Sequence, residues 1–257
     1  MATRTRLLTG SRALVTGATG GLGQAQVAAL SDAGATVFAH GRARDARLGL
    51  LESIPSVSGI VADLSTPAGC RGLVREAART DGLDVLVANH ATMSMSLMSD
   101  ANEAEWWRVV ETNLLGTFAL IQEATLVMRE TGRGGRIVVI VSEWGVTGWP
   151  EATAYAASKA GLISLVKSLG HELAPEGIFV NAIAPGVIDT PQLSVDAEAA
   201  GLTLEEMHRE YSAGIPVGRI GQPEEIAEAV RFLCDPALTA MAGQTIQING
   251  GATRGRV

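Results

Sequence analysis

The sequence predicts an α/β fold in which helices cover both faces of a mainly parallel sheet. Seven short runs rich in valine, isoleucine and leucine recur along the chain, and none alternates cleanly between apolar and polar residues. Strands that are apolar on both sides are typical of a parallel sheet packed between two layers of helices. Longer segments with helical spacing separate these runs, and this β-α-β order indicates a doubly wound fold with right-handed crossovers.

The expected elements follow from these patterns in chain order. The strands are expected at 13–16, 36–39, 57–61, 85–88, 137–141, 178–183 and 245–248. The helices are expected at 22–32, 68–80, 103–130, 152–173 and 223–234. Segment 103–130 is long for one uninterrupted helix, so two helices are the alternative there.

A long irregular region at 185–221 carries only one short helical pattern, at 204–211. Loops of this length in a compact domain often form lids or binding loops. We therefore expect a lid at about 186–221, within a single domain that spans 1–257. A merely solvated insertion is the alternative.

The composition limits the class of protein. The chain carries 27 acidic and 20 basic side chains, a formal charge of -7, which argues against nucleic-acid binding across its whole surface. Cys70 and Cys234 are far apart and the four histidines show no metal-ligand spacing, so we expect neither a disulfide framework nor a catalytic metal. The apolar runs near the N-terminus are too short for a signal peptide, and no run reaches 18 residues. We expect a cytoplasmic protein without a membrane partner.

A glycine-rich loop follows the first expected strand. Residues 16–23 read TGATGGLG and lead into the first expected helix. Glycines permit a tight turn and let the backbone approach a pyrophosphate, while the helix N-terminus presents free N–H groups. A plain turn is the alternative, but the strand–loop–helix context favours a dinucleotide site in a Rossmann-like fold. The expected contacts are Thr16, Gly17, Gly21, Leu22 and Gly23.

Four polar residues between positions 113 and 159 suggest chemistry. Tyr155 and Lys159 are four residues apart in an expected helix and share one of its faces. A nearby cation favours a phenolate, so we expect a lowered pKa for Tyr155, which suits proton transfer near neutral pH. Ser142 ends an expected strand, at the edge where open α/β sheets bind ligands. Asn113 lies in an apolar stretch, which indicates a local break or a buried polar role.

Together these motifs resemble the short-chain dehydrogenase/reductase family, in its compact single-domain branch. Gly17 and Gly21 are four residues apart and Gly23 follows two later, which is the family's TGxxxGxG spacing. The family's catalytic tetrad is matched in order and spacing by Asn113, Ser142, Tyr155 and Lys159. The resemblance covers nearly the whole chain and implies an oxidoreductase that uses a nicotinamide cofactor.

The resemblance implies further cofactor contacts. The expected residues are Asp63 and Leu64 at the adenine, Asn89 between adenosine and active site, Tyr155 and Lys159 at the nicotinamide ribose, and Pro185, Gly186, Ile188 and Thr190 at the carboxamide. Asn89 is the part of the family's NNAG segment that is retained, while His90 and Ala91 depart from it. Whether His90 is a pocket group or a satisfied structural histidine is left open. Gly250 and Gly251 resemble the family's C-terminal ending.

The end of the second strand bears on the choice of cofactor. An acidic residue there would bind the ribose 2′-hydroxyl of NAD, whereas an arginine suits the 2′-phosphate of NADP. Gly41 stands at that position and Arg42 follows it, with Arg44 and Arg47 nearby. NADP(H) is therefore favoured and NAD(H) is the alternative, because Gly20 leaves the glycine loop without a second basic residue.

The implied reaction is reversible hydride transfer between nicotinamide C4 and a ketone or secondary alcohol. Tyr155 would exchange the proton of the substrate oxygen, Ser142 would polarise that oxygen, Lys159 would tune Tyr155, and Asn113 would support a water relay. Family position gives an apolar, adaptable lining that suits an apolar or cyclic substrate. Its expected residues are Met93, Met95, Trp144, Trp149, Val187, Leu193 and Tyr211. Methionines that merely pack a loop are the alternative, and Glu143 could face either the substrate or a neighbouring loop.

Three other functions remain open at this point. A 3-oxoacyl-carrier-protein reductase would need a basic patch for its acidic carrier, which Arg129, Arg133 and Arg136 could supply. A non-redox relative, such as a dehalogenase or lyase, tends to lose the glycine loop or the lysine. A nucleotide-binding regulator without turnover would not need the serine, tyrosine and lysine together. Many relatives are tetramers paired through their long helices, so we expect a homotetramer or a homodimer.

Overall fold

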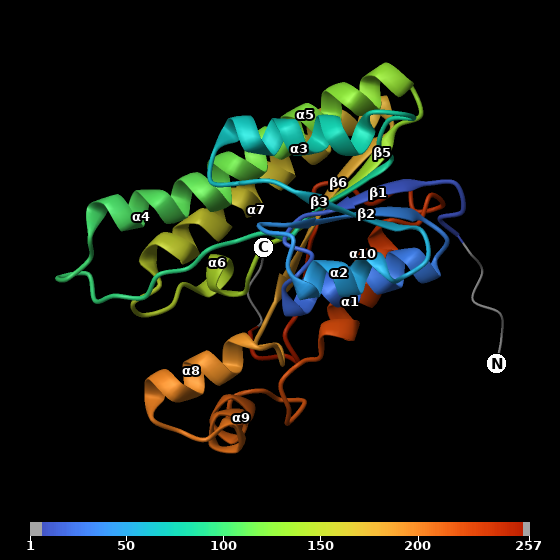
Figure 1. Ribbon diagram of the computed structural model, residues 1–257. Coiled ribbons are helices and arrows are strands. Elements are labelled where there is room, and N and C mark those ends of the chain that lie inside the picture. Colours follow the sequence, from blue (N-terminus) through green and yellow to red (C-terminus); the bar gives the residue numbers. More distant parts are fainter. Residues whose placement is uncertain (1–6, 254–257) are drawn as a thin grey trace.

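A seven-stranded parallel sheet forms the centre of the protein in the computed structural model, which describes residues 7–253 (Figure 1). The strand order is β3-β2-β1-β4-β5-β6-β7, and every adjacent pair is parallel. The strands are β1 (Arg12–Val15), β2 (Thr36–Gly41), β3 (Val57–Val61), β4 (Val85–Ala88), β5 (Gly135–Ile140), β6 (Ile178–Pro185) and β7 (Thr245–Ile248). The predicted fold class is confirmed. The first six and last four residues of the expected 1–257 unit lie outside the described residues.

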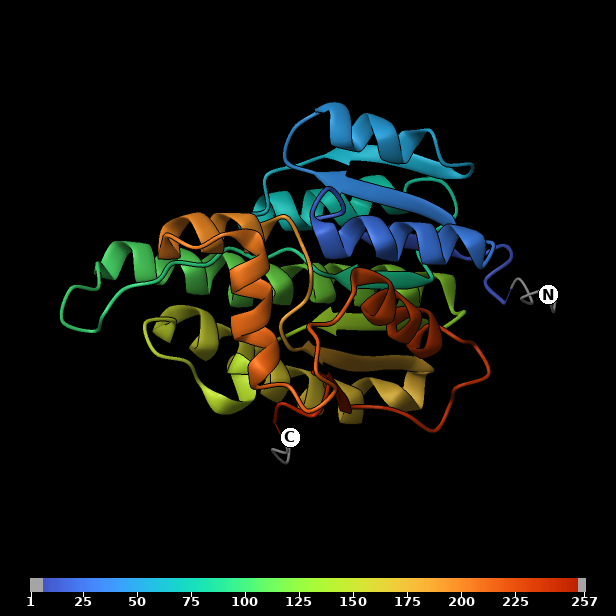
Figure 2. The same cartoon turned by 90° about the horizontal axis from the view of Figure 1, so that it is seen from below.

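Two layers of helices enclose the sheet. α3, α5 and α7 cover one face, and α1, α2 and α10 cover the other (Figures 1 and 2). The helices are α1 (Gly21–Asp32), α2 (Ala46–Glu52), α3 (Pro67–Ala78), α4 (Glu103–Val110), α5 (Gly116–Thr131), α6 (Trp144–Thr147), α7 (Thr153–Leu173), α8 (Gln192–Ala200), α9 (Leu204–Ala213) and α10 (Pro223–Leu233). Among residues 7–253, none of the helices is both long and apolar enough to cross a lipid bilayer.

The direction in which strands are added reverses beside β1, and this reversal places the site. From β1 the chain adds β2 and β3 on one side, then crosses to β4 and continues to β7 on the other. Ligands bind at the carboxyl ends of the strands at such a switch point in open α/β sheets. Thr16 and Asn89 directly follow β1 and β4 at this point, and the Thr16 N–H donates to the Val87 carbonyl at 3.0 Å.

The segment expected as one or two helices at 103–130 is a continuous helical run with one wide turn. α4 ends at Val110, a π-helical turn named η1 (Glu111–Leu115) follows, and α5 begins at Gly116. Such π turns inside helices are frequent at functional sites. Asn113 lies in this turn, so the local break that its amide predicts is confirmed.

Three helices, α2, α6 and α8, are not predicted from the sequence. α2 begins after Asp45, whose carboxylate accepts a hydrogen bond from the Leu48 N–H at 3.1 Å. α6 is a single turn. α8 lies in the region 185–221, where the expectation of only one short helical pattern is wrong. This helix buries only Leu193 and Ala197, which is too sparse an apolar pattern to recognise in the sequence.

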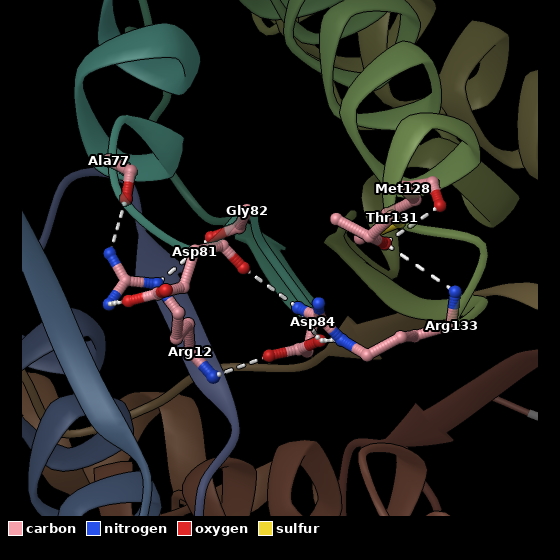
Figure 3. Close-up of polar contacts among 8 residues, drawn as sticks. All are labelled: Arg12, Ala77, Asp81, Gly82, Asp84, Met128, Thr131 and Arg133. Carbon is pink, nitrogen blue, oxygen red and sulfur yellow. Dashed lines mark hydrogen bonds and ion pairs between the residues drawn. The ribbon is translucent and has the colours of Figure 1, made fainter.

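The amino ends of the strands are tied together at the edge opposite the switch point (Figure 3). The Asp84 carboxylate, just before β4, accepts from the Arg12 backbone N–H at 2.9 Å and from the Arg133 guanidinium at 2.8 Å. The Arg12 guanidinium donates to the carbonyls of Gly82 and Ala77 at 2.9 and 3.1 Å. These contacts join β1, β4, α3 and the turn between α5 and β5.

Candidate active site

The glycine loop between β1 and α1 is packed too closely for side chains at several positions. Gly17 has a φ of +63°, which L side chains rarely adopt. A Cβ on Gly23 would lie 2.3 Å from the Gly17 carbonyl oxygen, and one on Gly21 would lie 2.9 Å from the Thr190 Cβ. Among residues 7–253 no side chain caps α1, and no acidic residue lies in its first turn. Within the described chain the N–H groups of Gly21 and Leu22 have no partner, so the loop fits an anionic pyrophosphate.

Thr16 and Asn89 join the two strand ends that border this loop. Asn89 donates from its backbone N–H to Thr16 Oγ1 and from Nδ2 to the Thr16 carbonyl, both at 2.9 Å. Buried His90 follows, with Nδ1 3.1 Å from Thr16 Oγ1 and Nε2 3.3 Å from the Thr112 carbonyl oxygen. A carbonyl only accepts, so Nε2 carries the hydrogen. Burial and the nearby charge of Lys159 lower the pKa of His90 to about 3. His90 is therefore a satisfied, neutral structural histidine.

Arg42 is available to a ligand, whereas its two neighbours are engaged. Arg44 donates to both carboxylate oxygens of Glu52 at 2.7 and 3.0 Å, and Arg47 pairs with Asp45 at 2.6 Å. Arg42 is exposed and makes no hydrogen bond or ion pair with another residue of 7–253. A free guanidinium is well suited to a phosphate.

The two residues expected at the adenine have different surroundings. The Asp63 carboxylate is exposed and accepts hydrogen bonds from the Ser65 N–H and hydroxyl, both at 2.9 Å. These bonds hold the pKa of Asp63 below its ordinary value. The Leu64 side chain is buried in the core under α3 and α5, so only its backbone can face a nucleotide.

The segment expected at the nicotinamide carboxamide leaves β6 and approaches the glycine loop. The Gly186 N–H donates to the Ile248 carbonyl at 3.0 Å. Pro185 and Ile188 are buried, the latter in the core beside α10. Thr190 packs so closely against Gly21 that a Cβ there would clash with it. The structure therefore brings 185–190 and the glycine loop to the same edge of the sheet.

Ser142, Tyr155 and Lys159 meet just beyond β5. Ser142 lies two residues after the strand ends, and the other two lie one turn apart on α7. Lys159 Nζ is 5.5 Å from the centroid of the Tyr155 ring. The lysine is only 2% exposed, and its Nζ donates to the Ile140 carbonyl at 2.7 Å. Burial lowers the pKa of Lys159 to about 8.

The pKa of Tyr155 corrects an expectation from the sequence. Burial raises this pKa above its ordinary value, and a hydrogen bond with Ser142 opposes the rise. The ammonium of Lys159 lies over the ring and bonds to Ile140, so it is not directed at the phenol oxygen. The expected lowering of the tyrosine pKa by the lysine is therefore wrong for this geometry.

Asn113 uses its side chain to join η1 to the segment after β4 and to α7. Its Oδ1 accepts from the Thr92 N–H at 2.8 Å, and its Nδ2 donates to the Thr92 carbonyl at 2.8 Å and to Ser158 Oγ at 3.1 Å. Both amide hydrogens are thus occupied. The side chain therefore has no free donor for the expected water relay to Lys159.

Two stacked indole rings extend from Tyr155 towards the surface. The ring centroids of Trp144 and Trp149 are 5.1 Å apart with an interplanar angle of 6°, and Trp144 meets Tyr155 edge-on at 6.0 Å. Trp149 is 48% exposed and Met95 is 44% exposed. The Ser96 N–H donates to the Glu151 carbonyl at 2.9 Å, which ties the methionine segment to the tryptophan segment. The result is an apolar wall with an open outer end.

Three other residues of the expected substrate lining, Val187, Leu193 and Tyr211, lie in or beside the α8–α9 region. Leu193 is buried in a small cluster with Ala197 and Met207, and Val187 and Tyr211 pack against this cluster. α8 and α9 project away from the sheet on the side of α1 and α10 (Figure 1). The Leu193 side chain therefore supports α8 from within.

Glu143 follows Ser142 and turns towards the segment after β6. Its N–H donates to the Pro185 carbonyl at 3.0 Å, and its Oε2 lies 3.3 Å from the place that a Cβ of Gly186 would take. This oxygen is buried and has no hydrogen-bond partner among the described residues. Burial raises the pKa of Glu143, and Asn249 opposes the rise. Of the two roles left open by the sequence, the geometry favours contact with the neighbouring segment.

A surface hollow of about 560 Å³ lies far from these residues, between the carboxyl ends of α3 and α5. Asp81, Gly82, Thr131 and Arg133 line it (Figure 3). Arg75 and Glu123, also in its wall, pair with each other at 2.6 Å. None of the expected site residues lines this hollow, so its size alone does not make it the active site.

The chain is similar over almost its full length to known proteins. A family model described as enoyl-(acyl carrier protein) reductase matches residues 17–253. A 3-oxoacyl-[acyl-carrier-protein] reductase of Aquifex aeolicus is 36% identical over 250 residues, 95% of this chain and 98% of the relative. Nodulation protein G of a Rhizobium species is 38% identical over 251 residues, 95% of this chain and 97% of the relative.

Solved structures are also similar to this chain over almost its full length. A short-chain type dehydrogenase/reductase of Mycobacterium marinum superposes with a TM-score of 0.86 at 32% identity, covering 96% of each chain. An Agrobacterium tumefaciens protein provisionally named 2-deoxy-D-gluconate 3-dehydrogenase, with bound NADP, also gives 0.86 at 32% identity, covering 97% of this chain and 98% of that one.

Proposed function

This chain belongs to the short-chain dehydrogenase/reductase family, and on that premise we propose that it catalyses reversible hydride transfer between a nicotinamide cofactor and a ketone or secondary alcohol. The observation that carries the proposal is the meeting of Ser142, Tyr155 and Lys159 beyond β5, at the same edge of the sheet as the glycine loop. A bound nicotinamide supplies the hydride chemistry, and the protein supplies orientation and electrostatics.

Each residue of the group has its own part in the reaction. The Tyr155 hydroxyl gives a proton to the substrate oxygen during reduction and takes it back during oxidation. Ser142 donates a hydrogen bond to the same oxygen as its charge grows. Lys159 donates to the Ile140 carbonyl, which holds its ammonium over the Tyr155 ring, where it would bind the nicotinamide ribose. Asn113 holds η1 and α7 in register through Thr92 and Ser158.

NADP(H) is the cofactor that we favour. Gly21–Gly23 of the loop would hold the pyrophosphate, and Thr16, Gly17 and Asn89 would shape the loop around it. Asp63 and the Leu64 backbone would hold the adenosine. The guanidinium of Arg42, unpaired within residues 7–253, would hold the 2′-phosphate. Gly186, Ile188 and Thr190 would face the nicotinamide end through their backbone and, in Thr190, a hydroxyl. NAD(H) remains the alternative.

We propose a free, apolar or cyclic substrate. The stacked rings of Trp144 and Trp149 offer a flat apolar surface that leads to Tyr155, with Met95 at its rim. Val187 and the α8–α9 region would close over this surface as a lid. Its position beside segment 185–190 supports that role.

The second candidate is a 3-oxoacyl-carrier-protein reductase, which the name of the Aquifex relative favours. It would need exposed basic groups for an acidic carrier. Arg129 forms two 2.6 Å bonds with Glu176, and Arg133 pairs with Asp84 at 2.8 Å. Arg136 donates to backbone carbonyls and stacks on a phenylalanine ring. With these arginines engaged, we rank a free small molecule first.

We also propose a homo-oligomer, a tetramer or a dimer, formed through the α4–α5 run. Trp107, Leu115, Phe118 and Leu126 are large apolar side chains of this run, and each is exposed. Exposed apolar surface of this kind marks an interaction site. A second copy of the chain is the partner that we propose for it.

One experiment tests the function itself. Purified protein is titrated with NADPH and NADH, with nicotinamide fluorescence as the readout, and then assayed against matched cyclic ketones, linear ketones and a 3-oxoacyl carrier. Binding with turnover of a free ketone supports the proposal. Turnover of the carrier substrate alone supports the second candidate. Binding without any turnover supports a regulator, and binding of neither cofactor supports a non-redox relative.

A further inference from the structure

We infer that His40 is a positioning residue that fixes the glycine loop for the cofactor and makes its affinity sensitive to acid. His40 lies near the end of β2 and is buried. Its Nδ1 accepts a hydrogen bond from the Gly17 N–H at 3.0 Å, and its backbone carbonyl accepts from the Ala18 N–H at 2.8 Å. Two successive peptide groups of the loop are therefore held by one residue that is 23 positions away in the chain.

The contacts determine the protonation state of the ring. Nε2 of His40 lies 3.1 Å from the Ala62 carbonyl oxygen, which can only accept, so Nε2 carries a hydrogen. Nδ1 faces the Gly17 N–H, which can only donate, so Nδ1 carries none. The imidazole is thus neutral, with one fixed tautomer. A second proton on Nδ1 would direct two N–H groups at each other and break the bond to Gly17.

This bond matters for the loop because Gly17 adopts a positive φ and begins the turn into α1. His40 uses the N–H groups of Gly17 and Ala18. Those of Thr19, Gly21, Leu22 and Gly23 have no partner within the described chain. His40 thus separates the peptide groups that hold the loop from those that a pyrophosphate can bind. The inference rests on the proposed function in one respect, namely that this loop binds the cofactor.

The charged groups around His40 favour its neutral form. Burial lowers the pKa of His40 below its ordinary 6.5, Arg42 on the same strand acts in the same direction, and the bond to Ala62 opposes both. Across the loop lies neutral His90, and the Asp63 carboxylate beyond Ala62 is engaged by Ser65. His40 therefore stays neutral at pH 7. Cofactor affinity falls as the pH drops through its lowered pKa, because only the neutral form is competent to bind.

Two substitutions separate the two ring contacts. In His40→Asn the Oδ1 atom takes the place of Nδ1 and can still accept from Gly17. In His40→Gln the Nε2 atom takes the place of the ring Nε2, which keeps a donor for Ala62 but leaves the Gly17 N–H without a partner. By calorimetric titration with NADP⁺ at pH 7.5, we expect His40→Gln to weaken binding about tenfold and His40→Asn to bind within about twofold of wild type.

A pH series then tests whether cofactor affinity is sensitive to acid. Binding of NADP⁺ is measured from pH 7.5 to 5, and the wild type is compared with His40→Asn at each pH, so that titration of the cofactor phosphate cancels. We expect the wild type to lose affinity relative to His40→Asn towards the acid end of this range. His171→Asn, at an exposed position on α7, is the control and follows the wild type.

The outcomes distinguish this inference from the proposed function. Wild-type protein that binds no nicotinamide cofactor overturns the function. Wild type that binds, with His40→Gln binding equally well, overturns the inference alone. Thermal unfolding of the cofactor-free variants shows whether each one folds. Should both variants fail to fold, the pH profile of NAD⁺ binding by the wild type decides instead. NAD⁺ lacks the 2′-phosphate, so an affinity that stays constant from pH 7.5 to 5 contradicts the inference.

Discussion

Lys159 donates a 2.7 Å hydrogen bond from its buried ammonium to the carbonyl of Ile140, two residues before Ser142. The bond directs the ammonium to the end of β5 and places it 5.5 Å from the centre of the Tyr155 ring. A buried charge with a neutral partner is costly, which is why the pKa of this lysine falls to about 8. Function and stability therefore make opposite demands on this side chain.

Lys159→Met is expected to abolish turnover and to stabilise the fold. Between pH 8 and the ordinary lysine pKa of 10.5, unfolded wild type binds a proton that the folded state has released, so its stability rises with pH in that window. The variant lacks this rise and is more stable than wild type at pH 7. Urea unfolding of both proteins at pH 7, 8 and 9 measures the difference in stability and its change with pH, and steady-state kinetics measure turnover. A variant that is less stable at pH 7, or that keeps the rise, would contradict the interpretation.

Tyr155→Phe is expected to lower kcat by about 10²–10⁴-fold, because the substrate oxygen loses its proton partner. The phenyl ring still fills the same space against Trp144, so the Kd for the cofactor remains close to that of wild type. Steady-state kinetics and fluorescence titration measure the two quantities. Substantial turnover in this variant would remove the tyrosine from the proposed mechanism.

Arg42→Ala is expected to weaken NADPH binding about tenfold or more and to leave NADH binding unchanged, because only NADPH carries the 2′-phosphate. Arg44→Ala is the matched control, since Arg44 is paired with Glu52. Parallel fluorescence titrations give the ratio of the two Kd values for each protein. Equal loss for both cofactors in Arg42→Ala would favour a structural role for this arginine.

Trp149→Ala is expected to raise KM for cyclic ketones about threefold to tenfold while kcat stays near the wild-type value, because the outer half of the indole stack is removed. A linear ketone with the same number of carbons is the control substrate, and its KM should change less. An equal rise in KM for both ketones would argue against a flat binding surface at this position.

Phe118→Glu is expected to lower the mass of the particle in solution, because it introduces a charge into the apolar face that we assign to a second copy. Light scattering after size exclusion measures the mass. Val195→Glu, on α8 and likewise exposed, is the control and should leave the mass unchanged. Wild type that is already monomeric would contradict the proposed assembly.

The sequence predicts well the elements that depend on residues close together in the chain. The seven strands follow from continuous apolar runs, and the glycine loop follows from a spacing within eight residues. Tyr155 and Lys159 share a helix face for the same local reason. The break at Asn113 is also local, since a buried amide in an apolar helix needs a special environment.

What the sequence could not predict depends on contacts between distant residues. The raised pKa of Tyr155 comes from burial and from the turning of Lys159 towards Ile140, neither of which a YxxxK pattern reveals. Glu143 contacts Pro185 at the end of β6, and His40 on β2 accepts a hydrogen bond from Gly17, which follows β1. α8 has so few buried positions that its apolar pattern is masked by alanine and charge.

Figure 3 shows the ties that join Arg12, Asp84 and Arg133 at the amino ends of the strands. They lie at the opposite edge of the sheet from every residue assigned to chemistry. Substitutions near Met95, Trp149 or in α8–α9 leave this network untouched. Changes in substrate specificity at the carboxyl ends of the strands therefore need not alter the contacts at their amino ends. It is a favourable starting point for directed evolution, in which loops from relatives with other substrates are grafted onto one edge while the other edge preserves the fold.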